Sequence, residues 1–338
     1  MVMYMSKMVH LTAKRIIYFM FLLVFSVGCN DYEGDALDFD FVIPRDEVFA
    51  ESIKEYQLFT EPLDELTPQT DVYLYELNSE LFTDYAGKQR LIRLPEGAKA
   101  SIQEDRIIYP NGTLLAKTFY FDADLSDSSQ GRKIVETRLL IKREGQWNVA
   151  TYQWNEEQSD AHLILEGAEV PISFIDHSQN QRQTKHQIPS EVACVTCHQY
   201  GEQSVYIGPT LKNLDRNVER TGTTVNQLEY MADQDLLPAD LSSSTPMVNY
   251  KDDSLSLTQR ARSYLDINCA HCHNPQAWSR PAQKDLNLHY EVPFVNTGIS
   301  DNLKALKRNI QSGEMPFIGT TLKHSEGIEL LLSYLNSL

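Results

Sequence analysis

The chain is poor in cysteine, methionine and basic residues. It has 338 residues, of which 5 are cysteine, 8 are methionine and 30 are lysine or arginine, against 47 acidic residues. The formal net charge of -17 disfavours nucleic acid as a partner. After residue 28 no apolar run is long enough to span a bilayer. Residues 46–177 have no cysteine, no metal-ligand cluster and no nucleophile–base arrangement, so the residues that carry chemistry lie elsewhere.

Four of the five cysteines form two copies of Cys-x-x-Cys-His, in residues 194–198 and 269–273. This pattern is typical of covalent c-type haem attachment. The two sulfurs form thioether bonds with the haem vinyl groups, and the adjacent histidine reaches the iron from the same side. We therefore predict two covalently bound haem c groups. The first would be held by Cys194, Cys197 and His198, and the second by Cys269, Cys272 and His273.

Zinc binding and thiol redox chemistry are the alternatives for these motifs. Zinc ribbons carry two Cys-x-x-Cys pairs about 15–20 residues apart, whereas the interval from Cys197 to Cys269 is much longer. A thioredoxin-like motif does not require the histidine that ends both copies. Spacing and the duplicated histidine both favour haem.

The N-terminus carries an export signal. Three basic residues precede an apolar run over 16–27, which is too short for an ordinary membrane span and suits a signal-peptide core. The run ends in residues 25–29, Phe-Ser-Val-Gly-Cys, which resemble a bacterial lipobox. We predict a lipoprotein signal peptide over 1–28, lipidation of Cys29, and an acidic tether over 29–45. A simple cleaved signal or a short uncleaved anchor is the alternative, and each exports the chain.

Residues 46–180 are predicted to form a β-rich domain. The run Thr113–Phe121 carries apolar residues on both faces, which indicates a central strand. The runs Ile134–Ile141 and Trp147–Trp154 flank the turn signal Glu144-Gly145 and predict a β-hairpin.

Residues 251–338, the predicted second haem domain, carry helix signals on both sides of the second motif. Ser256 and Gln259 form a capping box before apolar residues at helical spacing. A middle helix is expected after Ser300, with Gly313 as its stop. A last helix carries the apolar stripe Ile328, Leu331, Leu332 and Leu335.

Helix, motif, helix, Met-Pro loop and C-terminal helix together resemble a class I cytochrome c. The resemblance implies that Met315 is the distal ligand of the second haem, which raises the reduction potential of the iron. In the alternative, Met315 is a packing residue and His324 or His289 is the ligand.

Residues 181–250 are the predicted first haem domain. Residues 207–211, Ile-Gly-Pro-Thr-Leu, resemble the Gly-Pro-x-Leu segment of class I cytochromes c. The resemblance implies that the carbonyl of Pro209 accepts a hydrogen bond from the proximal imidazole.

The distal ligand of the first haem has several candidates. Met247 is preferred, because its separation from His198 is similar to that of Met315 from His273. Met231 lies in a helical stretch where core packing is the default. The remaining choices are a histidine such as His186, or no ligand at all.

The combination resembles an uncharacterised family of bacterial dihaem c-type cytochromes with an N-terminal β domain. The segments that carry the resemblance are 110–113 with Lys117, 136–140, 154–156, 188–190, 226–228, 260–265 and 268–273. The β domain is also weakly similar to that of cytochromes with a lysine-cross-linked haem that oxidise hydroxylamine. Lys117 invites that comparison, although a strand lysine is more simply interpreted as solvated. The expected fold is α+β, with an N-terminal antiparallel β-rich domain followed by two mostly α-helical cytochrome c-like haem domains.

We predict a membrane-anchored electron-transfer protein outside the cytoplasm, on the periplasmic side of the outer membrane or at the cell surface. Its partners would be redox proteins, and its acidic surface would steer a basic one. One alternative is a haem enzyme, such as a dihaem peroxidase or a nitrogen-species oxidase, with an open site on the first haem. In another, the β domain docks a dehydrogenase and the haems are its electron outlet.

Overall fold

The computed structural model describes residues 49–338, except 104–105, 201–202, 240, 242–244, 278–284 and 317–318. The described residues belong to one compact unit, Arg45–Leu338. The predicted signal peptide, Cys29 and the tether lie outside the described residues. Among the residues described, no helix has the length and apolarity of a membrane span.

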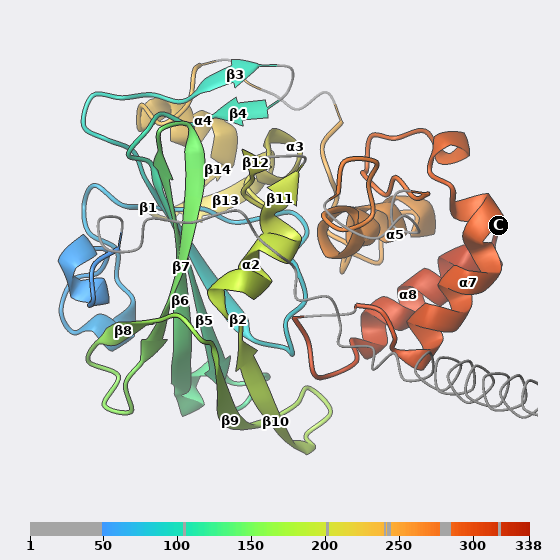
Figure 1. The fold of residues 1–338 in the computed structure, drawn as a ribbon, viewed down its shortest axis with the longest axis horizontal. Coiled ribbons are helices and arrows are strands. Elements are labelled where there is room, and N and C mark those ends of the chain that lie inside the picture. Colours follow the sequence, from blue (N-terminus) through green and yellow to red (C-terminus); the bar gives the residue numbers. More distant parts are fainter. Residues whose placement is uncertain are drawn as a thin grey trace, which may run out of the picture. The chain divides into compact units, whose positions relative to one another are not determined.

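The centre of this unit is a six-stranded antiparallel sheet with the order β1–β2–β5–β6–β7–β8 (Figure 1). Its strands are β1 Tyr73–Leu74, β2 Gly87–Arg93, β5 Leu114–Asp122, β6 Arg132–Arg143, β7 Gln146–Trp154 and β8 Ala161–Ile164. The predicted hairpin and the central position of the 113–121 strand are confirmed. Glu144 and Gly145 join β6 to β7 with positive φ angles, 49° and 80°, as tight hairpin turns require.

The other strands form separate two-stranded ribbons. They are β3 Ser101–Gln103 with β4 Arg106–Ile108, β9 Ala168–Ile175 with β10 Gln181–Ile188, β11 Gln199–Tyr200 with β12 Gln203–Ser204, and β13 Asn217–Arg220 with β14 Thr223–Asn226. The helices are α2 Glu191–His198, α3 Leu211–Leu214, α4 Gln227–Asp233, α5 Leu257–Leu265, α7 Ile299–Ser312 and α8 Ser325–Asn336. Short turns are η2 Ile53–Tyr56, η3 Leu63–Glu65, η4 Ser128–Gln130, the π-helical η5 Asp266–Ala270, and η6 Phe294–Asn296.

Both faces of the central sheet are buried. Successive side chains along a strand point to opposite faces, and β5 carries apolar residues at both sets of positions. Leu114 and Ala116 of β5 point into a core shared with η2 and η3. Leu115 faces the opposite side and packs with α3 and α4. Phe119 and Phe121 lie further along that second face, where the β9–β10 ribbon covers them.

The expectation of two mostly helical cytochrome c-like domains is wrong. In residues 181–250 the longest described helix is α2, with eight residues, and two β-ribbons interrupt the helices. The apolar side chains of this segment join the core of the central sheet. The first motif and the Gly-Pro-x-Leu resemblance predicted a separate helical domain, but the short helices here bury their apolar residues against β-strands. The part of the chain that the structure describes is mostly β.

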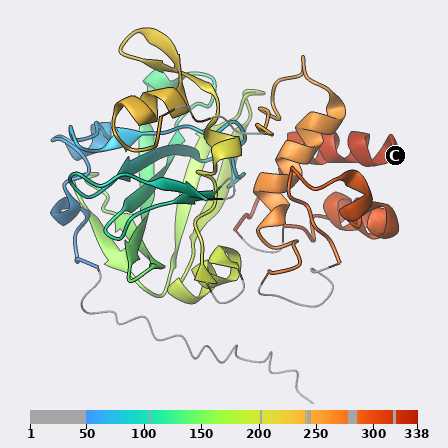
Figure 2. The same ribbon diagram turned by 90° about the horizontal axis from the view of Figure 1, so that it is seen from above.

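In residues 251–338 helices α5, α7 and α8 pack around their own apolar cluster (Figure 2). The predicted boundaries are confirmed locally: the Ser256 side chain accepts a hydrogen bond from the Gln259 N–H, and Gly313 ends α7 in the left-handed conformation. The three helices have 9, 14 and 12 residues, with long non-helical connections between them.

The helical segment is fastened to the loop that precedes β2. The carboxylate of Asp84 accepts hydrogen bonds from the backbone N–H groups of Thr321 and Leu322 at 2.8 Å each. The Asn268 side chain accepts a hydrogen bond from the Phe82 N–H at 2.8 Å. These bonds hold the second Cys-x-x-Cys-His motif in place beside the sheet.

Candidate functional site

Helix α2 carries the whole first motif. Residues three and four apart lie on the same side of a helix, so Cys194, Cys197 and His198 form one group. The helix packs against β7, and the backbone N–H of Cys194 donates to the Ser190 carbonyl at its start. A helical turn therefore presents both sulfurs and the imidazole together.

The second motif follows α5 through the π-helical turn η5. Such turns are rare and occur frequently at functional sites. The carbonyl of Cys269 accepts hydrogen bonds from the N–H groups of Cys272 and His273, at 3.1 and 2.8 Å. These bonds bring Cys272 and His273 close to Cys269, as the helical turn of α2 does for the residues of the first motif.

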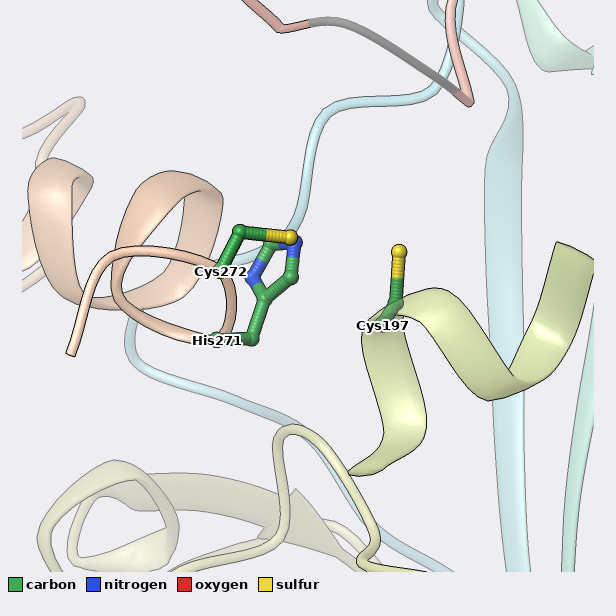
Figure 3. Close-up of side chains that lie close together, drawn as sticks. All are labelled: Cys197, His271 and Cys272. Atoms are coloured by element: carbon green, nitrogen blue, oxygen red, sulfur yellow. The ribbon is translucent and has the colours of Figure 1, made fainter. Parts of the chain in front are cut away.

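The structure brings the two motifs together. The Cys197 and Cys272 sulfurs and a ring nitrogen of His271 all lie within 4.8 Å of one another. Figure 3 shows that Cys197 comes from α2 whereas His271 and Cys272 come from the turn after η5. The four described cysteines are all free of disulfides. His271 was not singled out from the sequence, because it occupies a variable position of the motif.

The thiol environments differ. A hydrogen bond with Cys272 and burial raise the pKa of the Cys197 thiol, and the same bond lowers the pKa of Cys272. Burial raises the pKa of Cys269 to about 12. Redox-active dithiols usually have a lowered thiol pKa, and among these three thiols only that of Cys272 is shifted in that direction.

His198 is oriented by its neighbour across the β11–β12 ribbon. Its Nδ1 lies 2.8 Å from the Val205 carbonyl, and the Val205 N–H donates to the His198 carbonyl at 2.6 Å. An Nδ1–H donated to a carbonyl leaves Nε2 as the metal-ligating nitrogen. Burial and the charge of Lys117 lower the pKa of His198 to about 3, which keeps the ring neutral.

The bond partner of His198 differs from the one expected. The accepting carbonyl belongs to Val205, whereas the Pro209 carbonyl accepts the Tyr109 hydroxyl at 3.4 Å. The reason is the short ribbon after α2, which folds Val205 back onto His198 before the chain reaches Pro209.

The three methionines lie in different settings. Met247 is buried, and its N–H donates to the Lys212 carbonyl. Met231 is in the core beside the sheet, as its helical spacing suggested. Met315 is half-buried after α7, with its N–H 3.3 Å from the Asn309 carbonyl.

The histidines proposed as alternative ligands have partners. His186 Nε2 lies 2.7 Å from the carboxylate of Glu136, while its buried Nδ1 has no partner. The His324 ring stacks on Phe82 with centroids 4.1 Å apart, and its Nδ1 lies 2.9 Å from the Tyr264 hydroxyl. Burial lowers the pKa of His324 to about 4.

His289 is the third alternative ligand. Its Nδ1 lies 3.7 Å from an Asp266 carboxylate oxygen, beside the η5 turn.

Three cationic side chains of the central sheet form a group that was not predicted from the sequence, in which Lys117 was interpreted as a solvated strand residue. Arg90, Lys117 and Arg138 stand in one row across β2, β5 and β6. The signal was present in the sequence, since each is followed two residues later by a buried apolar residue on the same face. Such a pattern places a cation where an inward-facing apolar residue is expected.

Comparison of the chain with models of protein families, with curated proteins and with solved structures gave no match.

Proposed function

We propose that this protein is an exported dihaem c-type cytochrome that transfers electrons outside the cytoplasm. One observation carries the proposal: two Cys-x-x-Cys-His motifs, far apart in the sequence, meet so that Cys197 and Cys272 are within 4.8 Å. Two redox groups attached at adjacent sulfurs would lie close enough to exchange electrons. Electron exchange requires two redox groups close together, whereas a purely structural motif does not require a second copy beside it.

The donor set fits the group. Cys194 and Cys197 would hold the first haem with His198 Nε2 as the axial ligand, since Nδ1 is engaged with Val205. Cys269, Cys272 and His273 would hold the second. Bound haem supplies one-electron redox chemistry at potentials that its axial ligands set. The Val205 carbonyl holds the His198 imidazole in place, and burial keeps its ring neutral.

The distal ligands belong to the proposal as well. For the second haem we propose Met315, with His324 and His289 as alternatives. For the first we propose Met247, with His186 as the alternative. An iron without a distal ligand would instead open the site to a small molecule, as in a peroxidase.

The cellular setting also remains a proposal. Lipidation of Cys29 would anchor the chain to the periplasmic side of the outer membrane or to the cell surface. The acidic chain would pair with a basic redox partner, and a dehydrogenase docked on the β domain is one such donor. The likeness to the uncharacterised dihaem family stands on the quoted motifs alone.

Spectroscopy of the purified mature protein tests this function. A reduced-minus-oxidised spectrum counts the haems, and resonance Raman scattering identifies the axial ligands of both irons. We expect two low-spin, six-coordinate irons that do not bind carbon monoxide readily. If one iron binds carbon monoxide and the protein turns over peroxide or hydroxylamine rapidly, the protein is a haem enzyme and not an electron-transfer protein.

A metal site is the second candidate, favoured by the Cys197–His271–Cys272 group itself. Two thiolates and one imidazole suit zinc.

The metal site and haem attachment exclude one another, because Cys197 and Cys272 would be thiolates in the metal site and uncharged thioethers once haem is attached. Haem attachment does not use His271, whereas the metal site does. Metal analysis of His271→Ala, with His177→Ala at an exposed histidine as the control, separates the two: loss of bound zinc in His271→Ala alone, with no haem lost, would support the metal site.

A further inference from the structure

One row of the central sheet breaks the apolar pattern of the face it belongs to. Leu115 and Phe119 of β5 both point into apolar cores, and the residue between them on that face is Lys117. Strand register places Arg90 directly opposite Lys117, and Lys117 directly opposite Arg138. Like charges directly opposite one another destabilise a sheet. Arg90 is buried, and Lys117 and Arg138 are half-buried. Three neighbouring cations in such a setting are unexpected in a chain whose net charge is -17.

The two outer cations have carboxylate partners. Arg138 donates two hydrogen bonds to Glu136, at 2.8 and 2.6 Å, and Arg90 donates one to Glu80 at 2.7 Å. The central cation differs: among the described residues, no carboxylate forms an ion pair with Lys117. The row therefore carries its uncompensated charge at its centre.

A fourth cation adds to this charge. Lys88 precedes Arg90 on the same face of β2, and its Nζ lies 5.8 Å from the centre of the Phe119 ring. Lys117 Nζ lies 5.1 Å and Arg138 Cζ 4.5 Å from the same ring centre, and Phe119 is fully buried. When all four cations are protonated, Glu80 and Glu136 compensate two of them and leave an excess of two positive charges.

Burial makes this excess costly. Desolvation and the neighbouring Arg90 lower the pKa of Lys88 to about 7, and desolvation and Arg138 lower the pKa of Lys117 well below its usual range. Buried charges are retained when they are paired. An anion from outside the described chain would provide that pair.

The row lies on the sheet next to the first motif. Helix α2, which carries that motif, packs against β7, and β7 pairs with β6, where Arg138 lies directly opposite Thr151. Any group attached at Cys194 and Cys197 therefore lies beside the cations.

We propose that Arg90, Lys117 and Arg138, with Lys88, form an oxyanion-binding site beside the first motif, with Lys117 as its central contact. The ligand class is a carboxylate or a similar oxyanion. A haem attached at Cys194 and Cys197 brings two carboxylates, its propionates, and this source rests on the proposed function. A small free oxyanion has the same chemistry and is the other source.

Thermal unfolding of the Lys117→Met variant of the haem-loaded protein tests the site. Methionine keeps the length of the side chain and removes the charge. If Lys117 pairs with an anion, the variant melts at a lower temperature, and its unfolding equilibrium shifts by more than about tenfold. If Lys117 is an unpaired buried cation, its removal raises the melting temperature, which would overturn the proposal. Lys185→Met, which removes an exposed lysine paired with Glu169, is the control and should change little.

Two further measurements identify the source of the anion. If the propionates occupy the site, Lys117→Met shifts their resonance Raman modes and lowers the midpoint potential of the first haem, because a nearby cation favours the reduced iron. If a free oxyanion binds, inorganic phosphate or nitrite raises the melting temperature of the wild type and not that of Lys117→Met. The second arm works without haem, so failure of the proposed function is distinguished from failure of the site. If neither the propionate modes and midpoint potential nor the melting temperature with added oxyanion changes as described, the proposal is contradicted.

Discussion

At the scale of single residues, Glu136 is the charge on which the interior of the sheet depends. Its carboxylate is fully buried and binds both Arg138 and His186. Replacing Glu136 with Gln leaves Arg138 buried without a counter-charge, and we expect a loss of about 3 kcal/mol in the free energy of unfolding. Urea unfolding measures it. The matched control is Glu169→Gln, which breaks an exposed pair with Lys185 worth less than about 1 kcal/mol; equal losses in both variants would contradict the assignment.

The same carboxylate predicts a pH dependence. Burial alone would raise the pKa of Glu136, but Arg138 and His186 overcome it and lower the pKa to about 2. The interactions of Glu136 with Arg138 and His186 thus stabilise the folded state at pH values above about 4.3, the pKa of a glutamate in the unfolded chain. That contribution is lost as the pH falls toward 2. The free energy of unfolding should therefore fall between about pH 5 and pH 2, and fall less steeply in Glu136→Gln; parallel curves would show that Glu136 contributes nothing.

At the scale of elements, Gly167 controls how the chain enters α2. It has a φ of +76°, and a Cβ there would meet the Ile188 carbonyl at 2.6 Å and the Ser190 nitrogen at 2.8 Å. Gly97 has a similar φ of +71° with open space around it. Both alanine variants pay for the left-handed backbone, about 1 kcal/mol, and Gly167→Ala adds a clash of about 1–3 kcal/mol.

Chemical unfolding of both alanine variants gives the difference. Gly167→Ala should also displace the start of the first motif and reduce the proposed haem attachment, which Gly97→Ala should leave unchanged. Equal stabilities of the two variants would show that the approach of Gly167 to Ser190 has no consequence.

Element-scale predictions succeeded where the signal was local. The Glu144-Gly145 turn and the Ser256 cap depend on a few adjacent residues, and both were predictable. The prediction of a mostly helical first haem domain was wrong because Leu211, Leu228 and their neighbours pack against β-strands that precede them by more than about 60 residues. Sequence periodicity reports that a face is buried, but it does not report what buries it.

At the scale of the molecule, Asp84 fastens the C-terminal helices to the loop before β2. Its buried carboxylate binds two backbone N–H groups and the hydroxyl of Thr321. We expect Asp84→Ala to cost more than about 2 kcal/mol and to let α7 and α8 open separately, because they have their own core. Hydrogen exchange would show faster exchange confined to those helices. Asp127→Ala, which removes an exposed side chain bonded only within its own turn, is the control.

The excess of acidic residues predicts how salt would change the reduction of the proposed cytochrome by charged reagents. Reduction by a cationic reagent should slow as salt rises, since the screening length falls from about 30 Å at 0.01 M to about 3 Å at 1 M. An anionic reagent should show the opposite trend. Stopped-flow rates over this range test it; identical trends for both reagents would exclude electrostatic steering by the chain.

The meeting of the two motifs was not predictable from the sequence. Their spacing indicated the attachment chemistry, but the contact of Cys197 with Cys272 depends on long-range bonds such as that between Phe82 and Asn268. Lys117 illustrates the same limit, since its strand was predicted correctly while its place in a buried cationic row depends on the register of β2 and β6.

The intact mass of the mature, denatured protein tests the proposed chemistry most directly. Covalent attachment survives denaturation, so the account predicts a mass increase of two haems, falling to one in the double variant Cys194→Ala/Cys197→Ala and in Cys269→Ala/Cys272→Ala. A chain that carries no haem when produced with an active c-type haem attachment system, and holds a metal ion at Cys197 and Cys272 instead, would contradict it.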